Sequence, residues 1–148
     1  MRLKCFVAGL AALAMTAGAA SAAECSLPPE AEAGRVVAKQ CANCHELDPD
    51  KPSRPTGPNI HDVFGALPAS RKDFPKYSEG MQGAALKRAT WTETALFDYL
   101  GDPKLYLVKV YGAEVKHAMF WLLKDEQKRR DVIAFLKAIK GHKECRLN

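Results

Sequence analysis

Apolar residues recur at helical spacing most clearly toward the end of the chain. The stripe, spaced at i, i+3 and i+4, consists of Val132, Ile133, Leu136 and Ile139, with Phe135 beside it. Asp125 can cap this segment, and Gly141 is a natural residue to end it. Because the basic side chains fall mostly off the stripe, the pattern predicts an amphipathic helix between Asp125 and Gly141.

Two earlier segments also carry a helical pattern. A helix is expected from Glu30 to about Cys44, entered through Ser26-Leu27-Pro28-Pro29. The face that it buries is expected to hold Ala33, Val36, Val37 and Gln40 or Cys41. A second helix should stop before Pro103 and is marked by Trp91, Leu96, Tyr99 and Leu100. The stretch from Leu105 to Ala118 has no clear period and is expected to be a long loop.

A proline-rich stretch separates these helices. Residues 46–75 hold six of the nine prolines in the chain. Proline fixes φ and has no N–H, so this density prevents long helices or central strands there. The predicted fold class is therefore all-α, with helices joined by long loops. Such a chain buries little side-chain surface for its loop content, so another group should fill its middle.

The first 23 residues have the pattern of a secretory signal peptide. Arg2 and Lys4 precede an apolar run from Phe6 to Met15, and Ala20-Ser21-Ala22 fits the cleavage pattern. The run is short for a spanning helix, which makes an uncleaved anchor the weaker alternative. We expect residues 1–23 to be cleaved and residues 24–148 to form one domain in the periplasm, without stable membrane anchoring.

Composition narrows the possible functions further. The 148 residues are 47% hydrophobic with a formal net charge of +5, which is typical of a globular protein. Beyond Lys128-Arg129-Arg130 there is no basic cluster, so nucleic-acid binding is not expected. Of the five cysteines, Cys5 lies in the predicted signal peptide. The export signal places the other four in an oxidising compartment.

Cys41-Ala42-Asn43-Cys44-His45 carries the most specific chemistry. The C-x-x-C-H pattern is that of c-type haem attachment, in which two thiols bind the vinyl groups and the histidine ligates iron. A redox dithiol would require a thioredoxin-like βαβ setting, and zinc would require a second ligand pair. A plain disulfide between Cys41 and Cys44 is a third alternative. The export signal and His45 favour haem.

The sixth ligand of such an iron has several candidates. They are Met81, Met119, His61, His117, His142 and the lysines. Met119 is favoured because it lies in irregular sequence just before the last helix, where its thioether can reach the iron. Met81 is expected to pack in the haem pocket. The three histidines are expected to be solvated loop residues.

Further motifs follow the haem motif in a fixed order. They are Gly57-Pro58-Asn59, Tyr77-Ser78, Trp91, Tyr99, Pro103, Met119-Phe120-Trp121 and the segment from Arg130 to Lys137. With the haem motif, this series resembles the class I cytochromes c, the monohaem mitochondrial and bacterial type. The resemblance covers about residues 30–140. It implies a small cytochrome c fold of three to five helices around one covalent haem c held by Cys41 and Cys44.

The resemblance also implies a role for individual residues near the iron. The Pro58 carbonyl would accept the Nδ1 proton of His45, which fixes the ring and raises its basicity. Met119 would be the second axial ligand, with Tyr99 donating a hydrogen bond to its sulfur.

Other positions would surround the haem edge. Tyr77 and Trp91 would approach a propionate, and Trp121 would shield the edge. Ala66 stands where the family often has an arginine. The glycine expected at the crossing of the first and last helices corresponds to Gly34 or is replaced by Ala33.

If these two helices cross as the resemblance implies, the chain ends lie close together. An intramolecular Cys25–Cys145 disulfide is then expected, with free thiols or an intermolecular bridge as alternatives.

The function implied is a monomeric periplasmic electron carrier that is not an enzyme. Its partners would be redox proteins with acidic docking faces, such as a dehydrogenase, a membrane cytochrome complex, an oxidase or a reductase. The alternatives are a haem c enzyme or gas or redox sensor with a labile sixth ligand, such as a small peroxidase, and a haem-free zinc or disulfide module.

Overall fold

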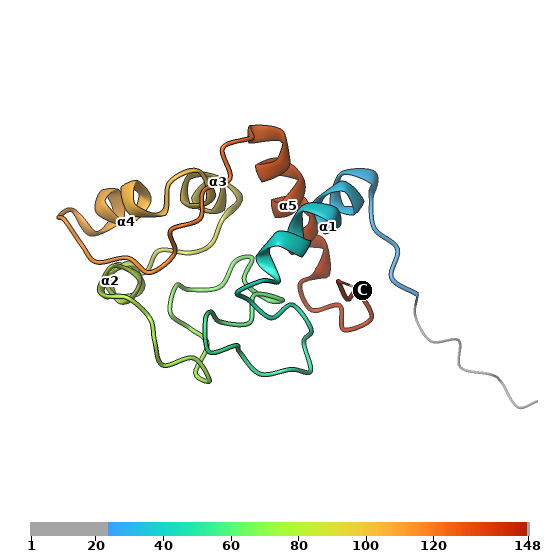
Figure 1. Ribbon diagram of the computed structural model, residues 1–148, viewed down its shortest axis with the longest axis horizontal. Helices are drawn as coiled ribbons and strands as arrows, with labels where there is room; N and C mark the ends of the chain where they lie inside the picture. Colours follow the sequence, from blue (N-terminus) through green and yellow to red (C-terminus); the bar gives the residue numbers. More distant parts are fainter. Residues whose placement is uncertain (1–23, 148) are drawn as a thin grey trace, which may run out of the picture.

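The computed structural model describes residues 24–147, so the predicted signal peptide at residues 1–23 lies outside the described part. The helices of this part are α1 (Pro29–Cys41), α2 (Glu79–Leu86), α3 (Glu93–Gly101), α4 (Pro103–Tyr111) and α5 (Glu126–Ile139). In the described range, β-structure is limited to an isolated bridge between Arg54 and Gly57. Figure 1 shows α1 and α5 together on one side and α2 and α4 on the other. The all-α prediction is therefore confirmed.

Side-chain caps determine where four of the helices begin. In each case a side-chain oxygen of the capping residue accepts a hydrogen bond from the backbone N–H three residues later. The capping residues are Ser78, Thr92, Asp102 and Asp125. The predicted cap at Asp125 is thus confirmed. Gly141, with φ of 76°, follows the end of α5 as expected.

The packing of α1 against α5 depends on Gly34. A Cβ added there would lie 1.8 Å from the Asp131 carbonyl oxygen and 2.9 Å from Phe135 Cβ. The residues that α1 buries are Ala31, Gly34, Val37 and Ala38. The predicted face was right for Val37 but wrong for Val36, which is 61% exposed, and for Ala33, which also faces solvent. Gly34 determines which face of α1 is buried, because only a glycine allows this close crossing with α5. A pattern of apolar residues does not reveal such a position.

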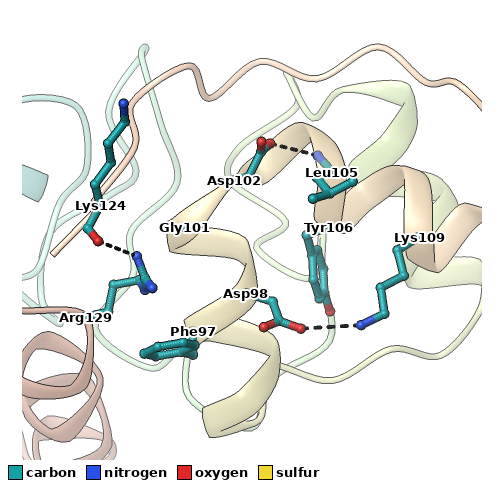
Figure 2. Close-up of a pocket in the computed structure, with 9 residues that line it drawn as sticks. All are labelled: Phe97, Asp98, Gly101, Asp102, Leu105, Tyr106, Lys109, Lys124 and Arg129. Atoms are coloured by element: carbon teal, nitrogen blue, oxygen red, sulfur yellow. Dashed lines mark hydrogen bonds and ion pairs between the residues drawn. The ribbon is translucent and has the colours of Figure 1, made fainter. Parts of the chain in front are cut away.

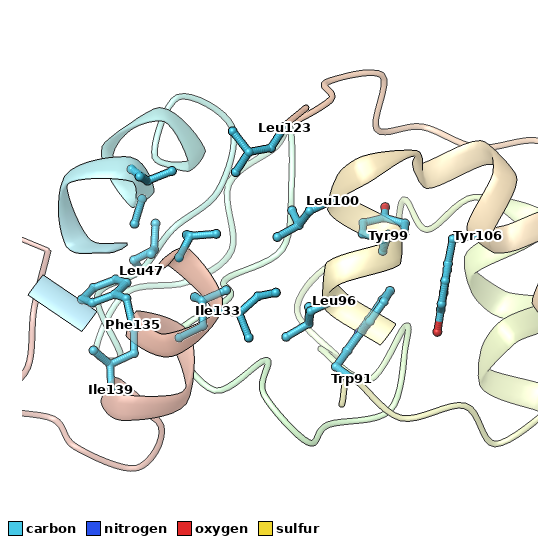
Figure 3. Close-up of a cluster of buried hydrophobic side chains, with 14 of the residues drawn as sticks. Leu47, Trp91, Leu96, Tyr99, Leu100, Tyr106, Leu123, Ile133, Phe135 and Ile139 are labelled. Atoms are coloured by element: carbon cyan, nitrogen blue, oxygen red, sulfur yellow. The ribbon is translucent and has the colours of Figure 1, made fainter. Parts of the chain in front are cut away.

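A second group of buried side chains joins α3 to α4. The Trp91 ring lies 4.9 Å from the Tyr99 ring and 5.6 Å from the Tyr106 ring. Leu96, Leu100 and Leu123 continue this group toward Phe135 and the α1–α5 pair (Figure 3). The core therefore runs as one cluster along the helical side of the molecule.

The segment from Leu105 to Ala118 was predicted to be a loop. This prediction was wrong for the first half of the segment, because α4 extends to Tyr111. Asp102 Oδ1 accepts the Leu105 N–H at 2.8 Å, and Pro103 occupies the first turn, where a missing N–H costs nothing. Pro103 therefore ends one helix and begins the next.

Helix α2 was not predicted because the residues that it buries are small. They are Gly80, Gly83 and Ala84. A Cβ on Gly83 would lie 2.3 Å from the Tyr111 ring, so the glycine lets α2 approach the end of α4 closely.

The proline-rich loop is fastened by polar contacts. Asn59, only 3% exposed, donates to the carbonyl oxygens of Asp48 at 2.7 Å and Lys51 at 2.9 Å. At the other end of the chain, Arg146 forms ion pairs with Asp48 and Asp50. The loop is therefore held both internally and by the C-terminal segment.

A disulfide joins Cys25 to Cys145, which confirms the predicted pairing. It closes a loop of 120 residues in sequence separation and ties the segment before α1 to the segment after α5.

We expect Gly34→Ala to lower the free energy of unfolding by about 2–3 kcal/mol, because the new methyl group meets backbone atoms of α5. Urea denaturation followed by circular dichroism measures the change. The matched control is Ala33→Ser on the exposed face of α1, which should stay within about 0.5 kcal/mol. Equal stability of Gly34→Ala and the wild type would refute the close crossing.

We expect the double variant Cys25→Ser/Cys145→Ser to unfold at lower denaturant concentration, with a loss of about 2–4 kcal/mol. Removing the crosslink restores freedom to the unfolded chain. Thiol counting under denaturing conditions before and after reduction verifies that the wild type carries the bond. An unchanged midpoint in the double variant would contradict a stabilising role.

Candidate functional site

The Cys41–His45 motif lies where α1 ends. His45 N donates to the Cys41 carbonyl at 2.9 Å, and Cys44 N donates to the same oxygen at 3.1 Å. Neither cysteine is in a disulfide; the Cys41 side chain is half-buried and that of Cys44 is exposed. Burial raises the pKa of the Cys41 thiol to about 11. The two cysteines are thus free thiols, not the disulfide considered as an alternative.

A zinc site finds no ligand set in the described part of the chain. Residues 24–147 contain no group of three or more His, Cys, Asp or Glu side chains placed to hold a metal ion. The all-α fold likewise gives Cys41 and Cys44 no thioredoxin-like setting.

His45 is held in one orientation by the residues beyond the motif. Its Nδ1 lies 2.9 Å from the Pro58 carbonyl oxygen, the contact that the sequence resemblance implied. A carbonyl oxygen only accepts, so Nδ1 carries the proton and Nε2 keeps its lone pair. Burial lowers the pKa of His45 and outweighs the opposing effect of the Pro58 hydrogen bond; the Arg54 charge lowers it further. A neutral imidazole with a free Nε2 is what a metal requires.

A short turn from Arg54 to Pro58 supports this imidazole. Arg54 N donates to the Gly57 carbonyl at 3.0 Å, and Gly57 N donates back at 3.3 Å. A Cβ on Gly57 would lie 2.7 Å from His45 Nδ1 and Cε1, so only glycine fits beneath the ring. The Thr56 hydroxyl donates to the Cys44 carbonyl at 2.7 Å. Gly57 and Pro58 were predicted from the sequence, whereas Arg54 and Thr56 were not.

These residues fit a covalent haem. Cys41 and Cys44 present two reduced thiols, and His45 offers an oriented neutral imidazole in the next position. Gly57 forms a cradle that any larger residue would fill. The donor set is that of a c-type haem rather than of zinc.

The candidates for the sixth ligand differ in their surroundings. Met119 and Met81 are both partly buried against the hydrophobic core. His61 was expected to be solvated, but this is wrong. It is 1% exposed, and its Nε2 lies 3.3 Å from the His142 carbonyl oxygen. The His117 ring packs against Phe120 at 4.7 Å.

The other predicted cofactor residues lie in contrasting settings. Trp91 and Tyr99 are buried and in contact, and burial raises the pKa of Tyr99 well above its usual value. The Tyr77 hydroxyl accepts the Arg71 N–H at 3.3 Å. Trp121 is 38% exposed. The hydrogen bond from Tyr99 to the Met119 sulfur stays a prediction.

A groove of about 460 Å³ lies between α3, α4 and the start of α5 (Figure 2). Within it, Arg129 lies over the Phe97 ring at 4.3 Å and donates to the Leu123 carbonyl at 2.6 Å and the Lys124 carbonyl at 3.1 Å. Arg129, which is 8% exposed, therefore holds the start of α5 against α3 and the segment before α5. None of the predicted site residues lines this groove.

The known proteins that the chain resembles are c-type cytochromes, in agreement with the geometry of the site. No protein-family model matches the chain. Cytochrome c2 of Rhodospirillum rubrum is 35% identical over 131 residues, which cover 88% of this chain and 92% of that protein. Cytochrome c-550 of Paracoccus denitrificans is 37% identical over 117 residues, covering 72% of each.

Solved structures agree with these relatives. Cytochrome c2 from Rhodobacter sphaeroides superimposes with a TM-score of 0.68 at 32% identity, covering 76% of this chain and 95% of that one. Cytochrome c2 from Paracoccus denitrificans gives a TM-score of 0.66 at 34% identity, covering 75% and 96%. With two free thiols, an oriented histidine and relatives of this similarity, the chain belongs to the cytochrome c2 and c-550 family of class I c-type cytochromes.

Proposed function

We propose that the protein is a soluble electron carrier with one haem c attached through Cys41 and Cys44 and ligated by His45 and Met119. The observation that carries the proposal is the 2.9 Å hydrogen bond between His45 Nδ1 and the Pro58 carbonyl. His45 directly follows Cys44, the second of the two free thiols. When bound, the haem supplies an iron centre that accepts and releases one electron. The chain belongs to a family of electron carriers, which agrees with the expectation that the protein is not an enzyme.

The side chains around the iron do not take part in bond-making in this proposal. His45 donates through Nε2, while Pro58 holds the proton on Nδ1. The Met119 thioether would be the second protein ligand, and with both ligands in place the iron would have no open position for a substrate or a gas. Trp91 and Tyr99 are both buried and pack against each other, so they would add an apolar aromatic wall if they line the haem as proposed. If His45 and Met119 hold the iron in both redox states, the reorganisation on electron transfer would be small.

The proposed location is the periplasm. Residues 1–23 are proposed as a cleaved signal peptide and residues 24–148 as the mature domain. In residues 24–147, no helix has both the length and the apolar character needed to cross a membrane. The Cys25–Cys145 disulfide suits an oxidising compartment.

A docking surface is proposed beside Met119. Phe120 is 74% exposed, Trp121 38% and Leu122 41%, and an exposed apolar patch of this kind is typical of an interaction site. Lys116 and Lys124 are exposed on either side along the chain. We propose that a redox partner with an acidic rim docks here, with the basic charges speeding encounter at low salt.

Replacing Met119 with alanine tests the ligation. We expect the ferric protein to become high-spin and to lose its weak red sulfur-to-iron absorption band, and the reduced protein to bind carbon monoxide at once. The matched control, Met81→Ala, removes the other partly buried thioether and should leave both spectra as in the wild type. Immediate carbon monoxide binding by the wild type would instead favour the enzyme or sensor alternative.

Substituting Gly57 with alanine tests the support beneath His45. The added methyl group would push against the imidazole and weaken its hydrogen bond to Pro58, at a cost of about 1–3 kcal/mol in unfolding free energy. A weaker Nδ1 hydrogen bond makes the imidazole a poorer donor, so the midpoint potential should rise. Optical redox titration measures this. Gly112→Asn, at a left-handed position with open space around it, is the control and should leave the potential unchanged. An unchanged potential in Gly57→Ala would contradict the role of the cradle.

A further inference from the structure

Arg54 places a permanent cation on the His45 side of the site. Its backbone forms both hydrogen bonds of the bridge to Gly57, and Gly57 lies directly against the His45 ring. The guanidinium Nε is buried and has no hydrogen-bond partner in residues 24–147. The bridge uses only main-chain atoms, so it places the Arg54 backbone in the turn that supports His45 and leaves the guanidinium available for other contacts.

Glu46 supplies the matching negative charge. Its Oε2 lies 3.5 Å from Arg54 Nη2, and the side chain is only 14% exposed. Its Oε1 accepts the N–H groups of Leu47 at 2.9 Å and Asp48 at 3.1 Å. Both N–H donors and the Arg54 guanidinium stabilise a negative charge on this carboxylate, so Glu46 faces Arg54 as an anion.

Two opposite charges therefore stand close to the ligating imidazole. Arginine stays protonated at every physiological pH. Oxidation of the proposed carrier adds a positive charge at the iron, so a nearby cation disfavours the oxidised form and a nearby anion favours it. Partial burial of both side chains, 41% and 14% exposed, limits the screening of their charges by solvent and salt.

We propose that Arg54 and Glu46 form a charge pair that sets the redox potential from the His45 side, with Arg54 favouring the reduced protein and Glu46 the oxidised protein. This inference rests on the proposed electron-carrier function. It assigns a role to a positioning residue pair that acts on the iron through its field and through the turn around His45, without touching it.

The test compares midpoint potentials of the holoproteins by optical titration. At a fixed applied potential, Arg54→Gln should lower the ratio of reduced to oxidised protein by about twofold to tenfold. Arg54→Lys, which keeps the charge, should recover most of that ratio. Glu46→Gln keeps an oxygen to accept the Leu47 and Asp48 N–H groups and should raise the ratio. The double variant Arg54→Gln/Glu46→Gln should fall between the two single variants.

Arg130→Gln is the matched control. Arg130 forms an ion pair of the same 3.5 Å length with Glu126 on α5, so its removal changes the net charge equally without altering the turn around His45. The ratio should stay within the error of the wild type. Thermal unfolding of each holoprotein separates loss of stability from a change in potential.

Two results would overturn the inference. One is a ratio of reduced to oxidised protein in Arg54→Gln equal to that in Arg130→Gln. The other is a drop of this ratio in Arg54→Lys as large as in Arg54→Gln, which would assign the effect to side-chain shape rather than charge. If Arg54→Gln fails to fold, a Glu46→Gln ratio at or below that of the wild type overturns it independently. Failure of the proposed function is distinguishable, because the wild type itself would then lack a haem spectrum or a one-electron transition.

Discussion

The hydrogen bond from His45 Nδ1 to the Pro58 carbonyl is the contact on which the rest of the site depends. It selects the tautomer, turns the imidazole, and leaves Nε2 available for a metal. A donor and an acceptor so far apart in sequence can meet only if the intervening loop keeps one shape. The Arg54–Gly57 bridge and the buried Asn59 side chain fix that shape, which gives the proline-rich segment its purpose.

The helices provide the frame for this arrangement. α1 delivers Cys41 at its last residue, and its close crossing with α5 at Gly34 fixes where that end lies. The C-terminal segment then returns to the loop through Arg146 and the Cys25–Cys145 disulfide. The loops have little regular structure and so few regular backbone hydrogen bonds. Contacts from the segments before α1 and after α5 help to hold them in place.

Much of this could be predicted from local sequence, because the relevant signals are local. The α5 stripe with its cap at Asp125, the Cys41–His45 motif and the prolines of the loop each act within a few residues. What escaped prediction depends on contacts distant in sequence. The burial of His61 follows from the C-terminal segment, and the buried face of α1 follows from Asp131 on α5. Arg54 was missed because an arginine in a loop carries no pattern until the turn around His45 is seen.

The central claim is that this fold holds one iron in a closed, sulfur- and nitrogen-ligated state that exchanges single electrons. An optically monitored redox titration of the mature wild-type protein tests it most directly. We expect a single reversible one-electron transition, with the weak red ferric band present in the oxidised protein and absent after reduction. A protein without haem absorption, or a high-spin ferric spectrum at neutral pH, would contradict it.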